Sequence, residues 1–539
     1  MIKKIINSKI NSITTAALLV ALSSLLSRFL GVFRDRILAG EFGAGEILDI
    51  YYAAFKIPDL IFNLLVLGAL SAGFIPIFTH LLRHEEVKDN QEAWRLASSV
   101  INILGIALII LSVMAMIFTS PLIHLFAPGF GPEKRALTIS LTRVMFLSPF
   151  FLGLSSILGG ILQSYKRFFA YSLAPIMYNI GIIIGALYLV PILGVYGLAW
   201  GVVIGALMHF LIQLPAVLSL GFKYSFIFNF KDLNVRKIGR LMIPRTMSLA
   251  IAQIDLLVST AIASTLVSGS LAVFNFANNL QTFPIGIFGI SFATAVFPTL
   301  SQFANDKKRL VMNFSTTLRQ ILFFIIPATV LFMVLPAQII RVILGSGKFN
   351  WDNTVLTINT LSFFSISLFA QATIPLLVRM FYARQNSKKP FYIGLVSVAV
   401  DICLSLWFSK IYGVAGLALA FSIANIVNFA LLWIVLKIDL GELDEAKILF
   451  SVFKFSVAGM AAGMVAQQMK SIIWPAIDMT KFGGVFMQGF VAGFTGIIVY
   501  VLICILFQSE ELFSFWDGLK RRLPFKKAPE EDQTEARGI

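Results

Sequence analysis

Long apolar runs recur from one end of the chain to the other, separated by short polar segments. A helix of about twenty apolar residues spans a hydrocarbon core about 30 Å thick, and each run is long enough to do so. The pattern therefore predicts an all-α polytopic membrane protein. We expect fourteen transmembrane helices, near residues 14–38, 48–79, 96–119, 136–164, 168–190, 195–220, 238–266, 270–301, 316–344, 355–383, 390–409, 413–436, 447–469 and 484–507.

The polar segments alternate in charge. One set of loops is rich in lysine and arginine, whereas the alternate set carries only Lys134, Arg135, Lys348, Lys410, Lys470 and Lys481. Lysine and arginine are enriched in cytoplasmic loops, so both termini are expected in the cytoplasm. The run from Thr14 to Leu38 is too long for a cleaved signal peptide and contains arginines, which predicts that it is retained as the first helix.

Two sequence motifs occur twice. Gly194–Ala199 (GVYGLA) matches Gly413–Ala418 (GVAGLA), and Ala69–Pro76 resembles Ser291–Pro298. The copies lie 219 and 222 residues apart. These nearly equal offsets predict an internal repeat of six helices, with both copies in the same orientation.

The repeat divides the chain into regions. We predict an N-lobe at residues 1–222 and a C-lobe at 223–440, an arrangement that suits alternating access around a central site. Residues 441–510 contribute two further helices outside the repeat. Residues 511–539 are polar and charged, so we expect a disordered cytoplasmic tail.

Composition excludes several other classes of protein. Hydrophobic residues make up 58% of the chain and charged residues 13%, against roughly 45–50% and 25% in soluble domains. The net charge of +16 is spread over short loops, so nucleic-acid binding is not expected. Cys403 and Cys504 lie in apolar runs and the four histidines form no cluster. We therefore expect no disulfide, no metal and no cofactor.

Enzymatic motifs are also absent from the sequence. Gly345–Lys348 resembles part of a P-loop, but Val342 and Phe349 stand where that motif has glycine and serine or threonine. The sequence therefore indicates a transporter and not an enzyme. Without a nucleotide site, transport would be coupled to a monovalent cation gradient or to the membrane potential.

Ionisable residues within the apolar runs are the candidate functional residues, because each costs about 2.5–3.5 kcal/mol at a helix centre. The first two helices carry Arg28, Arg34, Asp35, Asp49, Lys56 and Asp59. Helical spacing allows the structural pairs Arg28–Asp35, Lys56–Asp49 and Lys56–Asp59. Alternatively, the surplus cations bind an anion, since the planar guanidinium fork suits a pyrophosphate. In the second half, Asp255 and Asp401 could form a cation site or be structural.

Several motifs resemble the MurJ (MviN) family of lipid II flippases, within the multidrug/oligosaccharidyl-lipid/polysaccharide flippase superfamily. They are Ser27–Asp35 (SRFLGVFRD), Phe42–Gly45, Ala54–Asp59 (AFKIPD), Gly68–Ser71, Phe74–Pro76, Ala127–Phe130 and Phe283–Gly289 (FPIGIFG). The resemblance implies export of lipid II, a lipid-linked peptidoglycan precursor, across the bacterial inner membrane. It implies that the last two helices form a groove for the lipid tail. Lipid II and membrane lipids are the expected partners of a monomer.

The resemblance also suggests roles for single residues. It makes Arg28 and Arg34 cavity arginines, and Asp35, Asp49 and Lys56 favoured positions. The chain departs from the pattern at Phe62–Asn63 and Asn279, where many members have arginine, and at Leu67 and Thr282, where many have an acid. Arg245 could replace the missing cation of the C-lobe.

Other functions are compatible with this pattern. A flippase for another undecaprenyl-pyrophosphate-linked glycan is compatible with the missing arginines. A cation-coupled multidrug exporter would fit the superfamily, but the basic first lobe argues against it. A scaffold that recruits cell-wall enzymes would leave the buried charges without a role.

Overall fold

The computed structural model describes residues 13–67, 73–84 and 90–522, and within these ranges every element is a helix. The all-α class predicted from the sequence is therefore confirmed. Helices from the first part of the chain are α2 (Ile13–Phe42), α3 (Glu46–Phe62), η1 (Asn63–Leu67), α4 (Ile75–His84), α5 (Gln91–Ile117), α6 (Thr119–Phe126), α7 (Pro132–Met145), α8 (Leu147–Ser164), α9 (Phe168–Ile184), η3 (Gly185–Leu189), α10 (Val190–Leu193), α11 (Tyr196–Leu211) and α12 (Leu214–Leu218). We call α2–α12 the first set.

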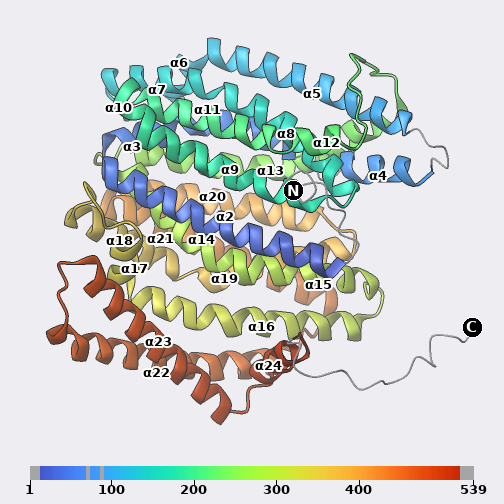
Figure 1. Ribbon diagram of the computed structural model, residues 1–539. Helices are drawn as coiled ribbons and strands as arrows, with labels where there is room; N and C mark the ends of the chain where they lie inside the picture. Colours follow the sequence, from blue (N-terminus) through green and yellow to red (C-terminus); the bar gives the residue numbers. More distant parts are fainter. Residues whose placement is uncertain (1–12, 68–72, 85–89, 523–539) are drawn as a thin grey trace, which may run out of the picture.

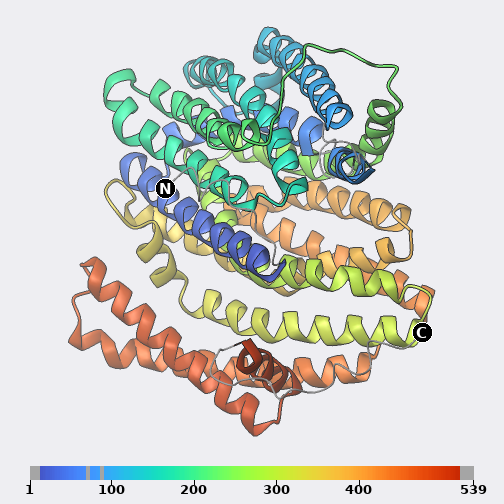
Figure 2. The ribbon, with the colours of Figure 1, turned by 45° about the vertical axis from the view of Figure 1, so that its right-hand side comes forward.

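A second set and a C-terminal group follow. The second set comprises α13 (Leu233–Ser264), α14 (Ser270–Pro284), η4 (Ile285–Ile290), α15 (Ser291–Gln302), α16 (Lys307–Val334), α17 (Pro336–Ile343), α18 (Trp351–Ser365), α19 (Leu368–Ala383), α20 (Lys388–Tyr412) and α21 (Val414–Leu440). The C-terminal group comprises α22 (Glu445–Ile473), η5 (Trp474–Ala476), α23 (Phe482–Leu506) and α24 (Glu510–Arg522). In Figures 1 and 2, α5 lies near one edge of the molecule, α22 and α23 lie along the opposite edge, and α2 and α14 run between them.

Ten of the described helical segments are long and apolar enough to cross a membrane, or eleven if α18 and α19, which meet at 45°, form one span. Three other predicted spans fall on α2, on the segment from α3 to α4, and on α13. These segments carry buried or cavity-facing charges, or include residues 68–72, which lie outside the described ranges. Apolarity alone therefore fails to identify the helices that carry the candidate site.

The first repeated motif has the same backbone conformation in both copies. Gly194, between α10 and α11, has φ 60° and ψ −147°, and Gly413, between α20 and α21, has φ 59° and ψ −136°. A positive φ favours glycine because it has no Cβ. The other motif cannot be compared, because Ala69–Ala72 lies outside the described residues.

Small residues allow two helices of the first set to pack backbone against backbone. A Cβ added to Gly181 would lie 2.2 Å from the Cα of Gly205, and one added to Gly185 would lie 2.4 Å from the Cα of Gly201. In membranes, such close contact stabilises helix pairs through van der Waals packing. These glycines therefore bring the backbone of α11 against that of α9 and η3.

The sequence predicts a disordered tail from residue 511, but residues 510–522 form helix α24. Glu511, which is 4% exposed, pairs with Arg319 of α16 and accepts a hydrogen bond from Ser451 of α22 at 3.0 Å. Lys447 of α22 pairs with Glu510 at 3.0 Å. The expectation was wrong for this stretch because a local count of charges does not reveal partners on distant helices. Residues 523–539 lie outside the described ranges.

Substituting Gly201 with alanine should destabilise the protein. The new Cβ would lie 2.6 Å from the Cα of Gly185, and overpacking of this kind costs about 1–3 kcal/mol. We expect a lower midpoint in thermal unfolding of the purified protein. Gly239→Ala on α13 is the matched control, since nothing lies within 4 Å of its Cβ. Equal midpoints for the two variants would contradict a stabilising role for this contact.

Candidate functional site: a charged cavity between the helix sets

A cavity of about 440 Å³ lies between the two helix sets. Its wall comes from α2, α3, η1, α8, α9, α11 and α14. The lining residues are Arg34, Leu38, Tyr51, Tyr52, Phe55, Lys56, Asp59, Phe62, Asn63, Leu152, Ser156, Pro175, Tyr178, His209, Asn275 and Asn279. Arg34, Lys56 and Asp59, three of the predicted site residues, therefore share one cavity.

Arg34 is held in the cavity wall by two partners, Asp35 and Asn179. Its guanidinium donates to Asp35 Oδ1 from Nη2 at 2.7 Å and from Nε at 3.0 Å. Nη1 donates to Asn179 Oδ1 of α9 at 3.0 Å. Asn279 of α14 donates to the other Asp35 oxygen at 2.9 Å. The predicted pair Arg28–Asp35 is therefore wrong, because seven-residue spacing on one helix does not show which neighbour satisfies the acid.

Lys56 makes its contact across the two sets. Its ammonium group lies 3.5 Å from Oδ1 of Asn275 on α14, and Asp59, one turn along α3, attracts it electrostatically. The predicted pair Lys56–Asp49 is wrong, since Asp49 pairs with Lys134. The cavity thus has cationic groups whose protein partners are in part neutral amides.

Arg28 lies outside this cavity lining. Its guanidinium packs on η4, where a Cβ added to Gly286 would lie 2.4 Å from Nη1. The next residue, Phe29, contacts Phe283 edge to face, with 5.8 Å between the ring centroids. Arg28 is therefore at the contact between α2 and the α14–η4 helix. Arg245 lies on α13, and its side chain is outside the described part of the structure.

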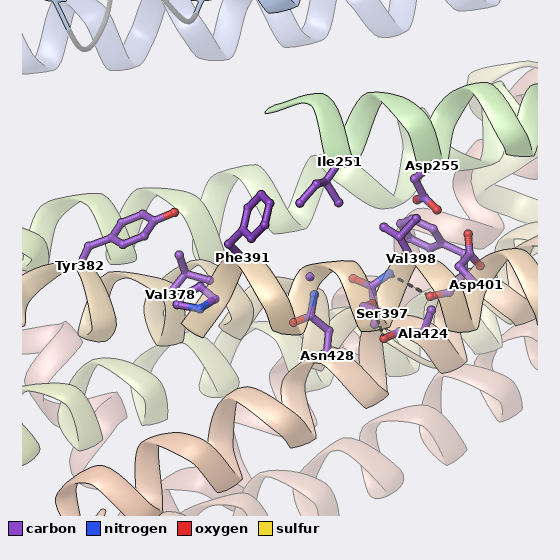
Figure 3. A pocket seen from close by; sticks show the side chains of 14 residues that line it. Ile251, Asp255, Val378, Tyr382, Phe391, Ser397, Val398, Asp401, Ala424 and Asn428 are labelled. Carbon is purple, nitrogen blue, oxygen red and sulfur yellow. Dashed lines mark hydrogen bonds between the residues drawn. The ribbon is translucent and has the colours of Figure 1, made fainter. Parts of the chain in front are cut away.

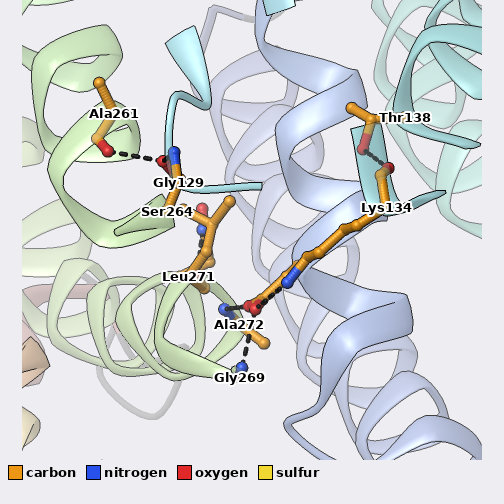
Figure 4. Close-up of polar contacts among 10 residues, drawn as sticks. Gly129, Lys134, Thr138, Ala261, Ser264, Gly269, Leu271 and Ala272 are labelled. Atoms are coloured by element: carbon orange, nitrogen blue, oxygen red, sulfur yellow. Dashed lines mark hydrogen bonds and ion pairs between the residues drawn. The ribbon is translucent and has the colours of Figure 1, made fainter. Parts of the chain in front are cut away.

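Asp49 joins the two sets at one end of the cavity. The side chain, in a residue 3% exposed, accepts hydrogen bonds from the backbone N–H groups of Gly269 at 2.7 Å and Ala272 at 3.0 Å, at the start of α14. Lys134 of α7 pairs with it at 3.0 Å, and Figure 4 shows the Lys134 side chain extending toward Gly269 and Ala272. A carboxylate is well placed at a helix N-terminus, because it satisfies free N–H groups and the helix dipole. We call Asp49 and these three partners the clamp.

Further contacts between the sets lie close to the clamp. Gly129 N–H donates to Ser264 Oγ at 3.1 Å (Figure 4), and Lys348 N–H donates to Gly40 O at 2.8 Å. Lys134 and Lys348 belong to the loops that the charge pattern assigns to the outer side. At another position, Thr246 of α13 donates to Leu64 O of η1 at 2.9 Å.

A second cavity, of about 280 Å³, lies within the second set. Asp255 of α13 and Asp401 of α20 face each other across it, with Asn425 and Asn428 of α21 and Ser397 in its lining (Figure 3). Among the described residues, the buried Oδ1 atoms of both acids have no hydrogen-bond donor, and the two carboxyl groups lie close enough to interact with each other. Oxygen ligands suit hard cations, and two carboxylates left with unsatisfied oxygens fit one such ion.

Sequence reasoning missed the neutral residues of these sites and Lys134. Asn179, Asn275 and Asn279 satisfy the charged groups, His209 lines the cavity, and Lys134 completes the clamp. A search for polar residues, and not only charged ones, inside the apolar runs would have found the asparagines. Lys134 gave no such signal, because the predicted spans place it in a loop, whereas it lies in the first turn of α7.

Comparison with known proteins finds one family repeatedly. The sequence model of the family described as "Lipid II flippase MurJ" matches residues 38–482. The chain is 29% identical over 432 residues to the lipid II flippase MurJ of Burkholderia cenocepacia, which covers 78% of this chain and 83% of that protein. It is 30% identical over 431 residues to the probable lipid II flippase MurJ of Vibrio cholerae, with coverage of 78% and 82%.

Solved structures agree with the sequence comparison. A lipid II flippase MurJ in an inward closed conformation matches with a TM-score of 0.75 and 26% identity, over 94% of this chain and all of that chain. An inward-facing multidrug resistance MATE family transporter of the MOP superfamily matches with a TM-score of 0.64 and 17% identity, over 80% of this chain and 99% of that chain. The second likeness shows a common fold alone.

Replacing Asp49 with alanine should open the clamp. The change removes the acceptor of Gly269, Ala272 and Lys134, and breaking a buried ion pair costs about 3–5 kcal/mol. We would replace both native cysteines, place a cysteine at Ser156 in the cavity, and label intact cells with a membrane-impermeant maleimide. Labelling from outside should become about tenfold faster or more.

The control for this experiment is Asp352→Ala, which removes an exposed acid near Lys348 in the sequence. That variant should label at the rate of the parent. If Asp49→Ala also labelled at the parental rate, the clamp would not hold the outer end closed.

Proposed function

The chain belongs to the MurJ family of lipid II flippases, and from this we propose that it moves lipid II from the cytoplasmic to the outer leaflet of a bacterial inner membrane. The observation that carries the proposal is the cavity between the helix sets, where Arg34 and Lys56 lie in a membrane-embedded wall. Lipid II has an anionic pyrophosphate between its tail and its sugar–peptide head. Arginine binds such groups through paired, charge-assisted hydrogen bonds.

We propose four head-group cations: Arg28, Arg34, Lys56 and Arg245. Arg34 is already paired with Asp35 at 2.7 Å. An incoming phosphate would therefore share the guanidinium of Arg34 with the carboxylate of Asp35. Lys56 has only a 3.5 Å contact with an amide oxygen and the attraction of Asp59. Its ammonium group therefore has more capacity for a new anionic partner than the guanidinium of Arg34 has.

The proposed architecture has fourteen membrane-spanning helices, in two six-helix lobes and a C-terminal pair. Ten or eleven apolar segments, together with the three charged segments that contain α2, α3 and α13, support this number. The alternation of basic loops supports cytoplasmic termini. We propose that the protein acts as a monomer, with the lobes rocking about the central cavity.

The lipid tail is proposed to follow α22 and α23 outside the cavity. On α23, Phe482, Phe486, Phe490 and Phe494 form a ladder of exposed rings with centroids 5.8–6.0 Å apart. Arg36 of α2 lies over the Phe482 ring at 5.1 Å. The ladder therefore begins beside the helix that also carries Arg34, which supports a path for the tail next to a head group in the cavity.

Coupling to a monovalent cation gradient or to the membrane potential is proposed to drive the cycle. The facing carboxylates Asp255 and Asp401 support the first of these (Figure 3). They belong to two different helices, so a bound cation would draw α13 toward α20. Because α13 also contacts the first set through Thr246, such a movement would reach the interface between the sets.

A second candidate substrate is another undecaprenyl-pyrophosphate-linked glycan. The observation that favours it is Asn279, which occupies the cavity wall where many family members have arginine. Both candidate substrates share the pyrophosphate and the lipid tail, and they differ in the sugar–peptide head.

Removing one cavity cation should abolish or severely reduce flipping. Each charged hydrogen bond contributes about 1.5–3 kcal/mol, so Arg34→Ala or Lys56→Ala should weaken head-group binding about tenfold or more. The measurement is rescue of a bacterium depleted of its lipid II flippase, with outer-leaflet lipid II as the readout. Arg309→Ala, an exposed arginine in a surface pair with Asp306, is the control and should rescue.

Wild-type protein that reaches the membrane but leaves lipid II in the inner leaflet would contradict the lipid II assignment. The same assay with other undecaprenyl-linked glycans would then test the second candidate. Arg28→Ala and Arg245→Ala, measured in parallel, test the two cations for which no cavity contact is described.

Neutralising the paired acids should remove cation coupling. Asp255→Asn and Asp401→Asn lower the negative charge that would attract a cation, while keeping side-chain size. In proteoliposomes, wild-type flipping should accelerate under an imposed sodium or potassium gradient, and the variants should not respond. Asp478→Asn, in an exposed loop, should respond like wild type. A response to the gradient in both cavity variants would rule out this site.

A further inference from the structure

His209 is a polar residue of the cavity wall whose role the charge arguments do not explain. It lies on α11 and lines the cavity together with Tyr178 of α9, whose ring centroid is 6.5 Å from that of the imidazole. On its other side, Nδ1 lies 2.7 Å from the hydroxyl of Ser155 on α8. The imidazole therefore has one nitrogen directed into the protein and one available to the cavity.

The hydrogen bonds around Ser155 determine which ring nitrogen carries the proton. Ser155 has a single hydroxyl proton, which it donates to the backbone carbonyl of His209 at 2.8 Å. Its oxygen accepts a hydrogen bond from Gln213 Nε2 at 2.6 Å. With the hydroxyl proton on this carbonyl, the 2.7 Å contact with His209 is a hydrogen bond only if Nδ1 donates, so we assign the ring proton to Nδ1, the tautomer that satisfies every contact of the hydroxyl.

In the neutral ring, Nε2 then carries a lone pair and acts as an acceptor. A neutral ring is favoured here because the imidazole is partly buried, and removal from water disfavours its charged form. Among the described residues, Nε2 makes no hydrogen bond. The cavity lining therefore includes an acceptor as well as cationic donors.

The chemistry of Nε2 selects its partner. A pyrophosphate offers only acceptor oxygens, so it cannot bind a neutral Nε2. The sugar–peptide head of lipid II offers N–H and O–H donors. We propose that His209 Nε2 accepts a hydrogen bond from an N–H or O–H of this head, which makes His209 a specificity-determining residue that distinguishes the glycan–peptide part of the substrate from its pyrophosphate. The inference rests on the proposed function.

A purely structural role is the competing explanation. The Ser155–His209–Gln213 hydrogen bonds join α8 to α11, so His209 could serve only to hold these helices together. The two roles use different nitrogens of the ring. They can be separated because asparagine reproduces the position of Nδ1, whereas glutamine reproduces the position of Nε2.

The experiment compares His209→Asn with His209→Gln in purified protein in lipid nanodiscs. Two ligands are titrated: lipid II, and undecaprenyl pyrophosphate, which lacks the sugar–peptide head. Thermal unfolding of each variant is measured in parallel. His209→Asn should bind lipid II about two- to tenfold more weakly, as expected for one lost hydrogen bond, with unchanged binding of undecaprenyl pyrophosphate and unchanged unfolding.

His209→Gln should show the reverse pattern. It should bind lipid II within about twofold of wild type, because its amide oxygen can replace Nε2, and it should unfold at a lower temperature because the contact with Ser155 is lost. Should this variant fail to fold, the three measurements on His209→Asn still decide the matter.

Two results would overturn the inference. One is wild-type affinity of His209→Asn for lipid II, and the other is an equal loss of affinity for both ligands. These results are distinct from a failure of the proposed function, in which wild-type protein itself would bind neither ligand and the inference would fail with it.

Discussion

The ion pair between Arg34 and Asp35, 2.7 Å apart in a helix that runs through the middle of the bundle, is the interaction around which the cavity is arranged. An ionised group inside a membrane protein must be satisfied by other polar groups. Asp35 takes a hydrogen bond from Asn279 of α14, and Arg34 gives one to Asn179 of α9. These contacts hold α2, α9 and α14 around one space. The cavity is polar there because the pair requires polar neighbours.

The same constraint explains the clamp. Asp49 is almost fully buried, and its partners come from both helix sets, as two backbone N–H groups of α14 and the ammonium group of Lys134. The contact between the two helix sets at this carboxylate stays closed only while all the partners of Asp49 remain in place. If the sets separate here, water must replace them together, so the clamp favours two discrete states over a continuum of partly open ones.

Much of the fold could be predicted from the sequence, because membrane helices must satisfy their own backbone groups and so appear as long apolar runs. Arg34, Lys56 and Asp59 were also recognisable, since charge is rare in such runs. The partners of the charged residues could not be predicted in this way. Asp35 and Asp49 have partners that helical spacing does not indicate, and Asp49 in particular is satisfied by backbone groups, which leave no trace in side-chain chemistry. Pairing depends on tertiary packing, which spacing on one helix does not contain.

The departures from the family pattern can be understood in the same physical terms. Where many members have arginine, this chain has Asn279, and where many have an acid nearby, it has Thr282. Removing both members of a buried pair is tolerated much better than removing one. Asn279 still donates to Asp35 at 2.9 Å. The carboxylate of Asp35 therefore has a hydrogen bond from this position without the positive charge that an arginine would add. The chain therefore retains a polar cavity with fewer charges than that pattern, and the proposed binding of a pyrophosphate would fall more heavily on Arg34 and Lys56.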